Sequence, residues 1–149
     1  MATNTELLAK NKRTTVQTES RVSDVRYSDF NTSFAVHPIK KDLSIQTDVA
    51  AIKQSVKNLL LTNKGERLFD PSIGSKIKSI LFENFSPQTI SACKSYVTQT
   101  ILNYEPRAQL LDVTVTPWPD KNLLVVRIVF GVINIEDPVT LDVVLEKIR

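Results

Sequence analysis

A rigid, charged corner stands at Glu105-Pro106-Arg107. Pro106 biases the residue before it away from the helical conformation, so a helix arriving from Gln88 should end at about Tyr104. Glu105 and Arg107 lie two residues apart on an extended segment, and their side chains should therefore point the same way. One interpretation is a solvated pair of charges, in which Arg107 adds only about 0–1 kcal/mol to stability. The other is a preorganised docking point, in which a rigid backbone presents a carboxylate beside a guanidinium fork, and the fork suits a planar acidic partner.

Carboxylate side chains could also cut a polysaccharide, because glycosidases use two of them across a cleft, one with a raised pKa. Glu66, Glu83 and Glu105 are available for this chemistry. Two of them lie beside a helix end or a loop, and Arg107 should lower the pKa of Glu105 rather than raise it. We therefore predict no catalytic residue and no small-molecule substrate. A cell-wall glycosidase of the lysozyme kind stays as the alternative function.

The sequence has one cysteine and one histidine, Cys93 and His37. A single cysteine excludes an internal disulfide, and this pair is too small a set for a structural zinc site. Cys93 falls on the apolar stripe of an expected helix, which favours a small core residue over a reactive thiol. His37 precedes a proline without other metal-binding residues beside it, and we interpret it as structural. No metal and no cofactor are predicted.

The composition is that of one globular domain, with 42% hydrophobic and 23% charged residues among 149. The net charge of +3 comes from 19 basic and 16 acidic residues, which is too balanced for a typical nucleic-acid-binding protein. The sequence also lacks an apolar run near the ~20 residues that a membrane span needs. We expect neither nucleic acid nor membrane among the partners.

Residues 1–26 carry too few apolar side chains for a core of their own. They are either a disordered tail or an arm that orders against a partner, and the sequence leaves both open. We predict an extended N-terminal arm at 1–26 and a single α+β domain at 27–149. Within that domain, scattered aromatic and aliphatic residues at 27–45 suggest an extended segment pinned to the rest.

Three helices are predicted in the first half of the domain. The first begins at Thr47-Asp48, with a hydroxyl as N-cap and an acid in the first turn, and closes at Gly65. The second is short, with Pro71 at its first position and Leu81 near its end. It contains Gly74, which should lower the stability of the helix by up to ~1 kcal/mol relative to alanine, unless close packing leaves no room for a side chain there. The third is capped by Ser86-Pro87 and ends at the charged corner.

The second half has the alternating pattern of strands. Apolar and polar residues alternate over 111–116 and again over 139–146. Residues 123–133 are apolar on nearly both sides, as in a central strand covered on two faces. Turn residues at 117–122 and 134–138 make the connections short, which indicates an antiparallel meander. The predicted fold is α+β: three helices and then a three-stranded antiparallel meander, which an N-terminal or partner strand could extend at an open edge.

Four short motifs follow one another along the chain: LLLTNKGER at 59–67, FDPSIG at 69–74, LFEN at 81–84 and NYEPR at 103–107. In their order and spacing, from about Tyr27 to Ile148, the chain resembles the baseplate wedge and sheath-initiator proteins of contractile-tailed phages. That family has relatives in type VI secretion baseplates. Residues 1–26 carry no such resemblance.

The resemblance implies a structural, non-enzymatic protein of the inner baseplate in the virion, assembled in the host cytoplasm. It further implies that Glu105, Pro106 and Arg107 anchor the subunit to the helical core bundle of the wedge. The sheet would accept strands from the first sheath ring and so initiate sheath assembly. The implied partners are other wedge proteins, the tail sheath protein, and the tail hub or tube. A second candidate site is the motif loop formed by Gly65, Glu66, Arg67, Pro71 and Gly74.

Overall fold

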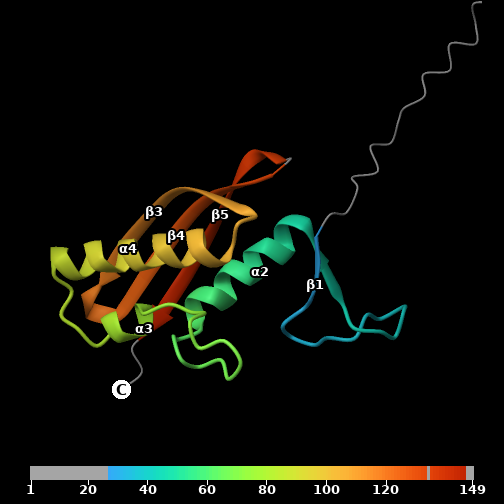
Figure 1. Cartoon of the computed structure of the whole chain (residues 1–149), viewed down its shortest axis with the longest axis horizontal. Coiled ribbons are helices and arrows are strands. Elements are labelled where there is room, and N and C mark those ends of the chain that lie inside the picture. Colours follow the sequence, from blue (N-terminus) through green and yellow to red (C-terminus); the bar gives the residue numbers. More distant parts are fainter. Residues whose placement is uncertain (1–26, 134, 147–149) are drawn as a thin grey trace, which may run out of the picture.

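A computed structural model describes residues 27–133 and 135–146 of the chain, so the arm expected at 1–26 lies outside the described residues. The described residues form three α-helices beside a three-stranded antiparallel sheet (Figure 1), which confirms the predicted α+β class. Two further short strands precede the helices. The elements in chain order are β1 (Ser28–Phe30), β2 (Ile45–Thr47), α2 (Asp48–Leu61), α3 (Ile77–Ile80), α4 (Pro87–Tyr104), β3 (Ala108–Trp118), the 3-10 helix η2 (Pro119–Lys121), β4 (Leu123–Val132) and β5 (Ile135–Glu146).

The sheet has the order β3-β4-β5, and both pairs of neighbours are antiparallel. The prediction of a turn over 134–138 is wrong, because β5 already begins at Ile135, which pairs with Val132. A register shift follows between Phe130 and Val132, and it places Pro138 in an irregular stretch of the strand. A proline is tolerated there because a bulge does not need its missing N–H.

The hydrophobic core lies between α4, α2 and one face of the sheet (Figure 1). Leu124, Val126, Ile128 and Phe130 of β4 point into it and are fully buried. The alternate residues of β4 are only half-buried or exposed, so the prediction that both faces of this strand are covered is wrong for the described residues. Apolar residues on both sides of β4 are the reason why the sequence predicts that its second face is also covered by other parts of the protein.

The core also contains Cys93, which has no exposed surface. Burial raises the pKa of its thiol to about 11, because the thiolate cannot be hydrated there. The prediction that Cys93 is a core residue is thus confirmed. None of the described helices is long and apolar enough to cross a membrane.

The helix boundaries differ from expectation at two places. α2 begins at Asp48 as predicted, but the Thr47 hydroxyl makes no capping hydrogen bond and the helix ends at Leu61. The second helix does not begin at Pro71, because α3 spans only Ile77–Ile80. Instead of beginning a helix, the Asp70 carboxylate accepts hydrogen bonds from the Ser72 N–H and hydroxyl and so closes a turn. Aspartate favours both turns and helix starts, and here the turn is formed.

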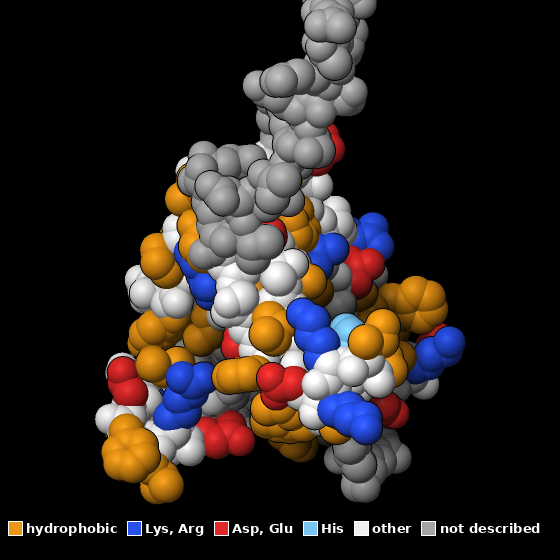
Figure 2. Space-filling model, turned by 90° about the vertical axis from the view of Figure 1, so that its right-hand side faces the viewer, with side chains coloured by type: hydrophobic (Ala, Val, Ile, Leu, Met, Phe, Trp, Pro, Cys, Tyr) orange, Lys and Arg blue, Asp and Glu red, His pale blue; other side chains and the backbone are white. Residues whose placement is uncertain are grey.

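The N-terminal lobe, residues 27–47, projects from the start of α2 (Figure 1). Hydrogen bonds pin it to the domain, since the Gln54 side chain donates to Phe30 O at 2.6 Å and accepts from Thr32 N at 3.1 Å. Figure 2 shows hydrophobic, basic and acidic side chains mixed on the face of the molecule that carries this lobe. The Nδ1 atom of His37 accepts backbone N–H groups at 3.2 and 3.3 Å, the structural role predicted for it. The exposed large apolar residues of the lobe are Phe30, Phe34, Val36, Ile39, Leu43 and Ile45.

Candidate protein-docking corner

The end of α4 forms the corner that Pro106 predicts. Tyr104 is the last helical residue, and the Glu105 N–H still donates to Ile101 O at 2.9 Å. Glu105 itself leaves the helical conformation, with φ −131° and ψ 74°. Three residues later, at Ala108, the chain enters β3, so the corner joins the main helix directly to the sheet.

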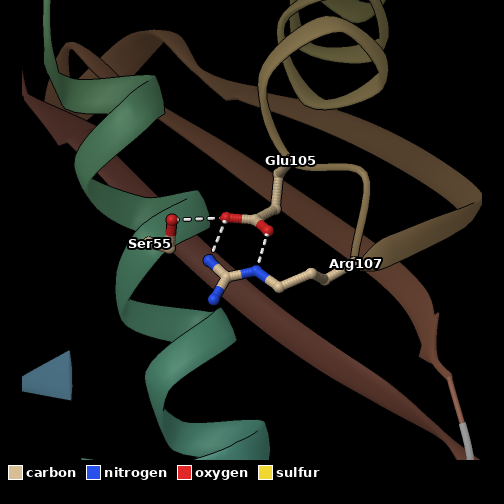
Figure 3. Close-up of polar contacts among 3 residues, drawn as sticks. All are labelled: Ser55, Glu105 and Arg107. Carbon is tan, nitrogen blue, oxygen red and sulfur yellow. Dashed lines mark hydrogen bonds and ion pairs between the residues drawn. The ribbon is translucent and has the colours of Figure 1, made fainter. Parts of the chain in front are cut away.

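Glu105 and Arg107 form a bidentate ion pair across Pro106. The Nε and Nη2 atoms of Arg107 donate to the two carboxylate oxygens of Glu105 at 2.5 and 2.8 Å. Figure 3 shows that the Ser55 hydroxyl, from α2, also donates to Glu105 Oε2. The two side chains therefore lie on the same side, as predicted. The solvated interpretation is wrong for Glu105, whose side chain is only 2% exposed.

The charge of Glu105 is stabilised despite its burial. Burial alone would raise the pKa of this carboxyl, but hydrogen bonds from Arg107 and Ser55 hold the pKa below its ordinary value. The hydrogen bond to Glu105 likewise raises the pKa of Arg107. A carboxyl with a lowered pKa is ionised at neutral pH, and it cannot serve as the general acid of a glycosidase.

Glu105 uses only part of the Arg107 guanidinium. A guanidinium has five N–H donors, and Glu105 takes two of them. The second terminal nitrogen points away from the carboxylate (Figure 3), and 35% of the side chain is exposed. The guanidinium also lies over the Tyr27 ring, 5.3 Å from its centroid. The corner thus presents an arginine whose orientation is fixed from two sides.

The motif loop lies next to the corner rather than within it. Its backbone turns at Gly65 and Gly74, with φ of 87° and 131°. A Cβ on Gly74 would lie 2.8 Å from backbone atoms of Thr62 and Asn63, just after α2, so close packing leaves no room for a side chain here. The Tyr104 hydroxyl donates to Ser72 O at 2.7 Å and ties the loop to the end of α4. Glu66, Arg67 and Pro71 all lie exposed on this loop.

Sequence reasoning missed Ser55 and Tyr27 as parts of the corner. Ser55 lies 50 residues from Glu105 and Tyr27 comes from the N-terminal lobe, so both contacts depend on tertiary packing. A hydroxyl on the inner side of α2 was the available signal for Ser55. Among the described residues, no group of three metal-binding side chains comes together.

Comparison with known proteins supports one assignment. The sequence profile described as baseplate wedge protein gp25 matches residues 46–135. The baseplate wedge protein gp25 of Enterobacteria phage T4 is 37% identical over 99 residues, which cover 66% of this chain and 75% of that protein.

Two solved structures have the same fold. One is a chain of the anti-feeding prophage baseplate, with 28% identity, a TM-score of 0.65, and coverage of 74% of this chain and 89% of that one. The other is a candidate tail lysozyme from Geobacter sulfurreducens, with 25% identity, a TM-score of 0.60, and coverage of 66% and 89%.

The fold, the ordered motifs and these similarities define a structural protein of contractile-tail baseplates. The chain belongs to the family of baseplate wedge protein gp25.

Proposed function

We propose that this chain anchors itself in the wedge of a tail baseplate through Glu105, Pro106 and Arg107, and that its sheet initiates sheath assembly. The observation that carries the proposal is the buried carboxylate of Glu105, which fixes a partly exposed arginine at a rigid corner. The proposed partners are other wedge proteins, the tail sheath protein, and the tail hub or tube. The proposed location is the virion baseplate, after assembly in the host cytoplasm.

Preorganisation is the physical argument for docking at Arg107. An arginine loses rotamer entropy when it binds, and Glu105 and Tyr27 have already fixed this one. Its remaining N–H donors suit a carboxylate or a carbonyl group of a wedge core helix. Pro106 restrains the backbone between the two charges, so the geometry survives without the partner. Glu105 acts by positioning Arg107, because its own oxygens are already occupied.

Strand addition is the proposed contact with the sheath. The outer edges of β3 and β5 have no further strand partner among the described residues, and these strands are 11 and 12 residues long. Such edges pair readily with an extended segment of another chain. Asp142 does not act as a free charge against pairing, because Arg127 binds it at 2.8 and 3.0 Å within the sheet.

The test is a neutral replacement of the whole pair, Glu105→Gln with Arg107→Gln. Replacing both charges avoids leaving a buried charge without its partner, so the fold should be retained. The same exchange at the exposed pair on the sheet, Arg127→Gln with Asp142→Asn, is the matched control. We expect the corner variant to melt near the wild type but to be lost from assembled baseplates, and the control to assemble. Normal incorporation of a folded corner variant would refute anchoring at the corner.

We also propose that the chain is not an enzyme. The name of the Geobacter sulfurreducens neighbour makes the lysozyme alternative worth testing. Of the three carboxylates considered, Glu105 is held ionised by Arg107. Glu66 and Glu83 are exposed to solvent, whereas the general acid of a glycosidase lies enclosed among apolar side chains.

A further inference from the structure

The motif loop ends in two adjacent apolar side chains that stand in solvent. Leu68 is 94% exposed and Phe69 is 102% exposed, more than any other large hydrophobic residue of the described chain. A single exposed leucine needs no explanation, but two fully exposed neighbours form the kind of apolar projection that other proteins bind. The anchoring corner makes no use of either residue.

The backbone of the loop is held in place before any partner arrives. The Gly65 N–H donates to Pro71 O at 2.8 Å and closes the loop at its base. The Glu66 carboxylate accepts the Asn63 N–H at 2.8 Å. These bonds reduce the backbone entropy that would be lost when the loop is bound. The loop therefore offers its two apolar side chains at low conformational cost.

The outward charge of this region is basic. Residues 63–82 contain two acids, and both are used inside the loop: Glu66 as above, and Asp70 through the Ser72 N–H at 3.2 Å and the Ser72 hydroxyl at 2.5 Å. The basic residues of the same stretch form no ion pair among the described residues. They are Lys64, Arg67, Lys76 and Lys78. The next carboxylate along the chain is Glu83, beyond α3.

The lysines gather around a hollow at the base of the loop. Lys64, Lys76 and Lys78 line a groove of about 520 Å³ that Phe82 also borders, and no acidic residue lines it. The loop tip and this groove together are the 64–82 surface. Figure 1 places the loop and α3 next to each other below α2.

We infer that the 64–82 surface docks into an apolar pocket with an acidic rim on another baseplate protein. Leu68 and Phe69 would fill the pocket, and carboxylates on its rim would meet the lysines of the groove. Charge argues against a second copy of this surface as the occupant, because basic groups would face basic groups. The inference rests on the baseplate role of the chain but not on the Glu105–Arg107 corner.

The first experiment places a photo-crosslinking benzoylphenylalanine at position 69 in assembled tails. The exposed apolar residue Leu102 of α4 is the control position. We expect position 69 to crosslink to one other baseplate chain, at a peptide with Asp or Glu within a few residues of the crosslink. A yield no higher than at position 102, or a crosslink to another copy of this chain, would overturn the inference.

The second experiment uses two variants in competition with the wild-type subunit for baseplate incorporation. They are Leu68→Ser with Phe69→Ser, and Lys64→Gln with Lys76→Gln and Lys78→Gln. We expect each to melt near the wild type and to be incorporated at least about tenfold less, as for hot-spot residues. Leu102→Ser should compete normally. Normal competition by the Leu68/Phe69 variant would contradict the inference.

Binding assays distinguish a protein partner of the 64–82 surface from a membrane or a nucleic acid. Purified subunit should not float with vesicles that contain phosphatidylglycerol, and should not bind single-stranded DNA at physiological salt. If either probe binds, and if the Leu68/Phe69 or lysine variants abolish that binding, the surface serves a membrane or a nucleic acid and the inference is wrong. Failure of the corner variant alone leaves the 64–82 surface standing, so the two proposals are tested separately.

Discussion

Removal of Arg107 alone should destabilise the subunit, although the sequence by itself predicts almost no effect. Arg107→Ala leaves the carboxylate of Glu105, 2% exposed, with only Ser55 as a side-chain donor. Breaking a buried ion pair costs about 3–5 kcal/mol. Because 35% of Arg107 is exposed, water can partly replace it, and we expect a loss of about 2–3 kcal/mol. For a domain of this size that is a fall in melting temperature of roughly 6–12 °C.

The loss should depend on pH in a defined direction. In the wild type the pKa of Glu105 is lowered, so its contribution is present above the unfolded-state pKa and is lost as the pH falls through the folded-state pKa. In Arg107→Ala, burial without the arginine should raise the pKa, so protonation relieves the penalty at acid pH. The difference in unfolding free energy between the two proteins should therefore shrink from pH 7 towards pH 4.

Urea denaturation at several pH values measures this difference, with Glu105→Gln/Arg107→Gln as the control that removes both charges. We expect the double variant to be more stable than Arg107→Ala at pH 7. An Arg107→Ala protein that unfolds at the wild-type urea concentration, or a difference that does not change with pH, would refute this account of the corner.

Three further predictions concern other parts of the chain. Gly74→Ala should lower the free energy of unfolding by about 2–4 kcal/mol, because a Cβ would lie 2.8 Å from backbone carbonyl groups at a φ of 131°; a urea midpoint equal to the wild type would contradict the packing. Cys93 should react with a thiol reagent at pH 8 only after unfolding, because its pKa is about 11 and its side chain is buried; fast reaction in the native protein would show that the site opens locally. Purified subunit should not hydrolyse peptidoglycan; turnover that Glu66→Gln or Glu83→Gln abolishes would restore the glycosidase alternative.

Local chemistry explains which parts of the fold could be predicted. Both ends of α4 follow from single residues: the Ser86 hydroxyl accepts the Thr89 N–H at 3.2 Å, and Pro106 ends the helix. Pro71 carried a similar signal and misled, because the carboxylate before it can close a turn as well as begin a helix. The choice between the two depended on Gly74, whose positive φ a helix cannot accommodate.

Long-range packing decided the rest. The apolar pattern of β4 predicted two covered faces, but the helices supply only one cover among the described residues. The burial of Glu105 could not be predicted either, because it depends on Ser55 in a different helix. Sequence reasoning therefore placed the two charges on the same side and left open whether the pair is solvated or forms a docking point.

The proposed anchoring would link assembly to stability through one side chain. Arg107 binds Glu105 with two donors, and under our proposal its remaining donors would bind a wedge protein, so the same guanidinium would serve both the monomer and the contact. A lysine is a single point charge and cannot hold both carboxylate oxygens while reaching outward. Arg107→Lys should therefore lose less stability than Arg107→Ala but recover little incorporation into baseplates. Full incorporation of Arg107→Lys would show that charge alone, and not the fork, makes the contact.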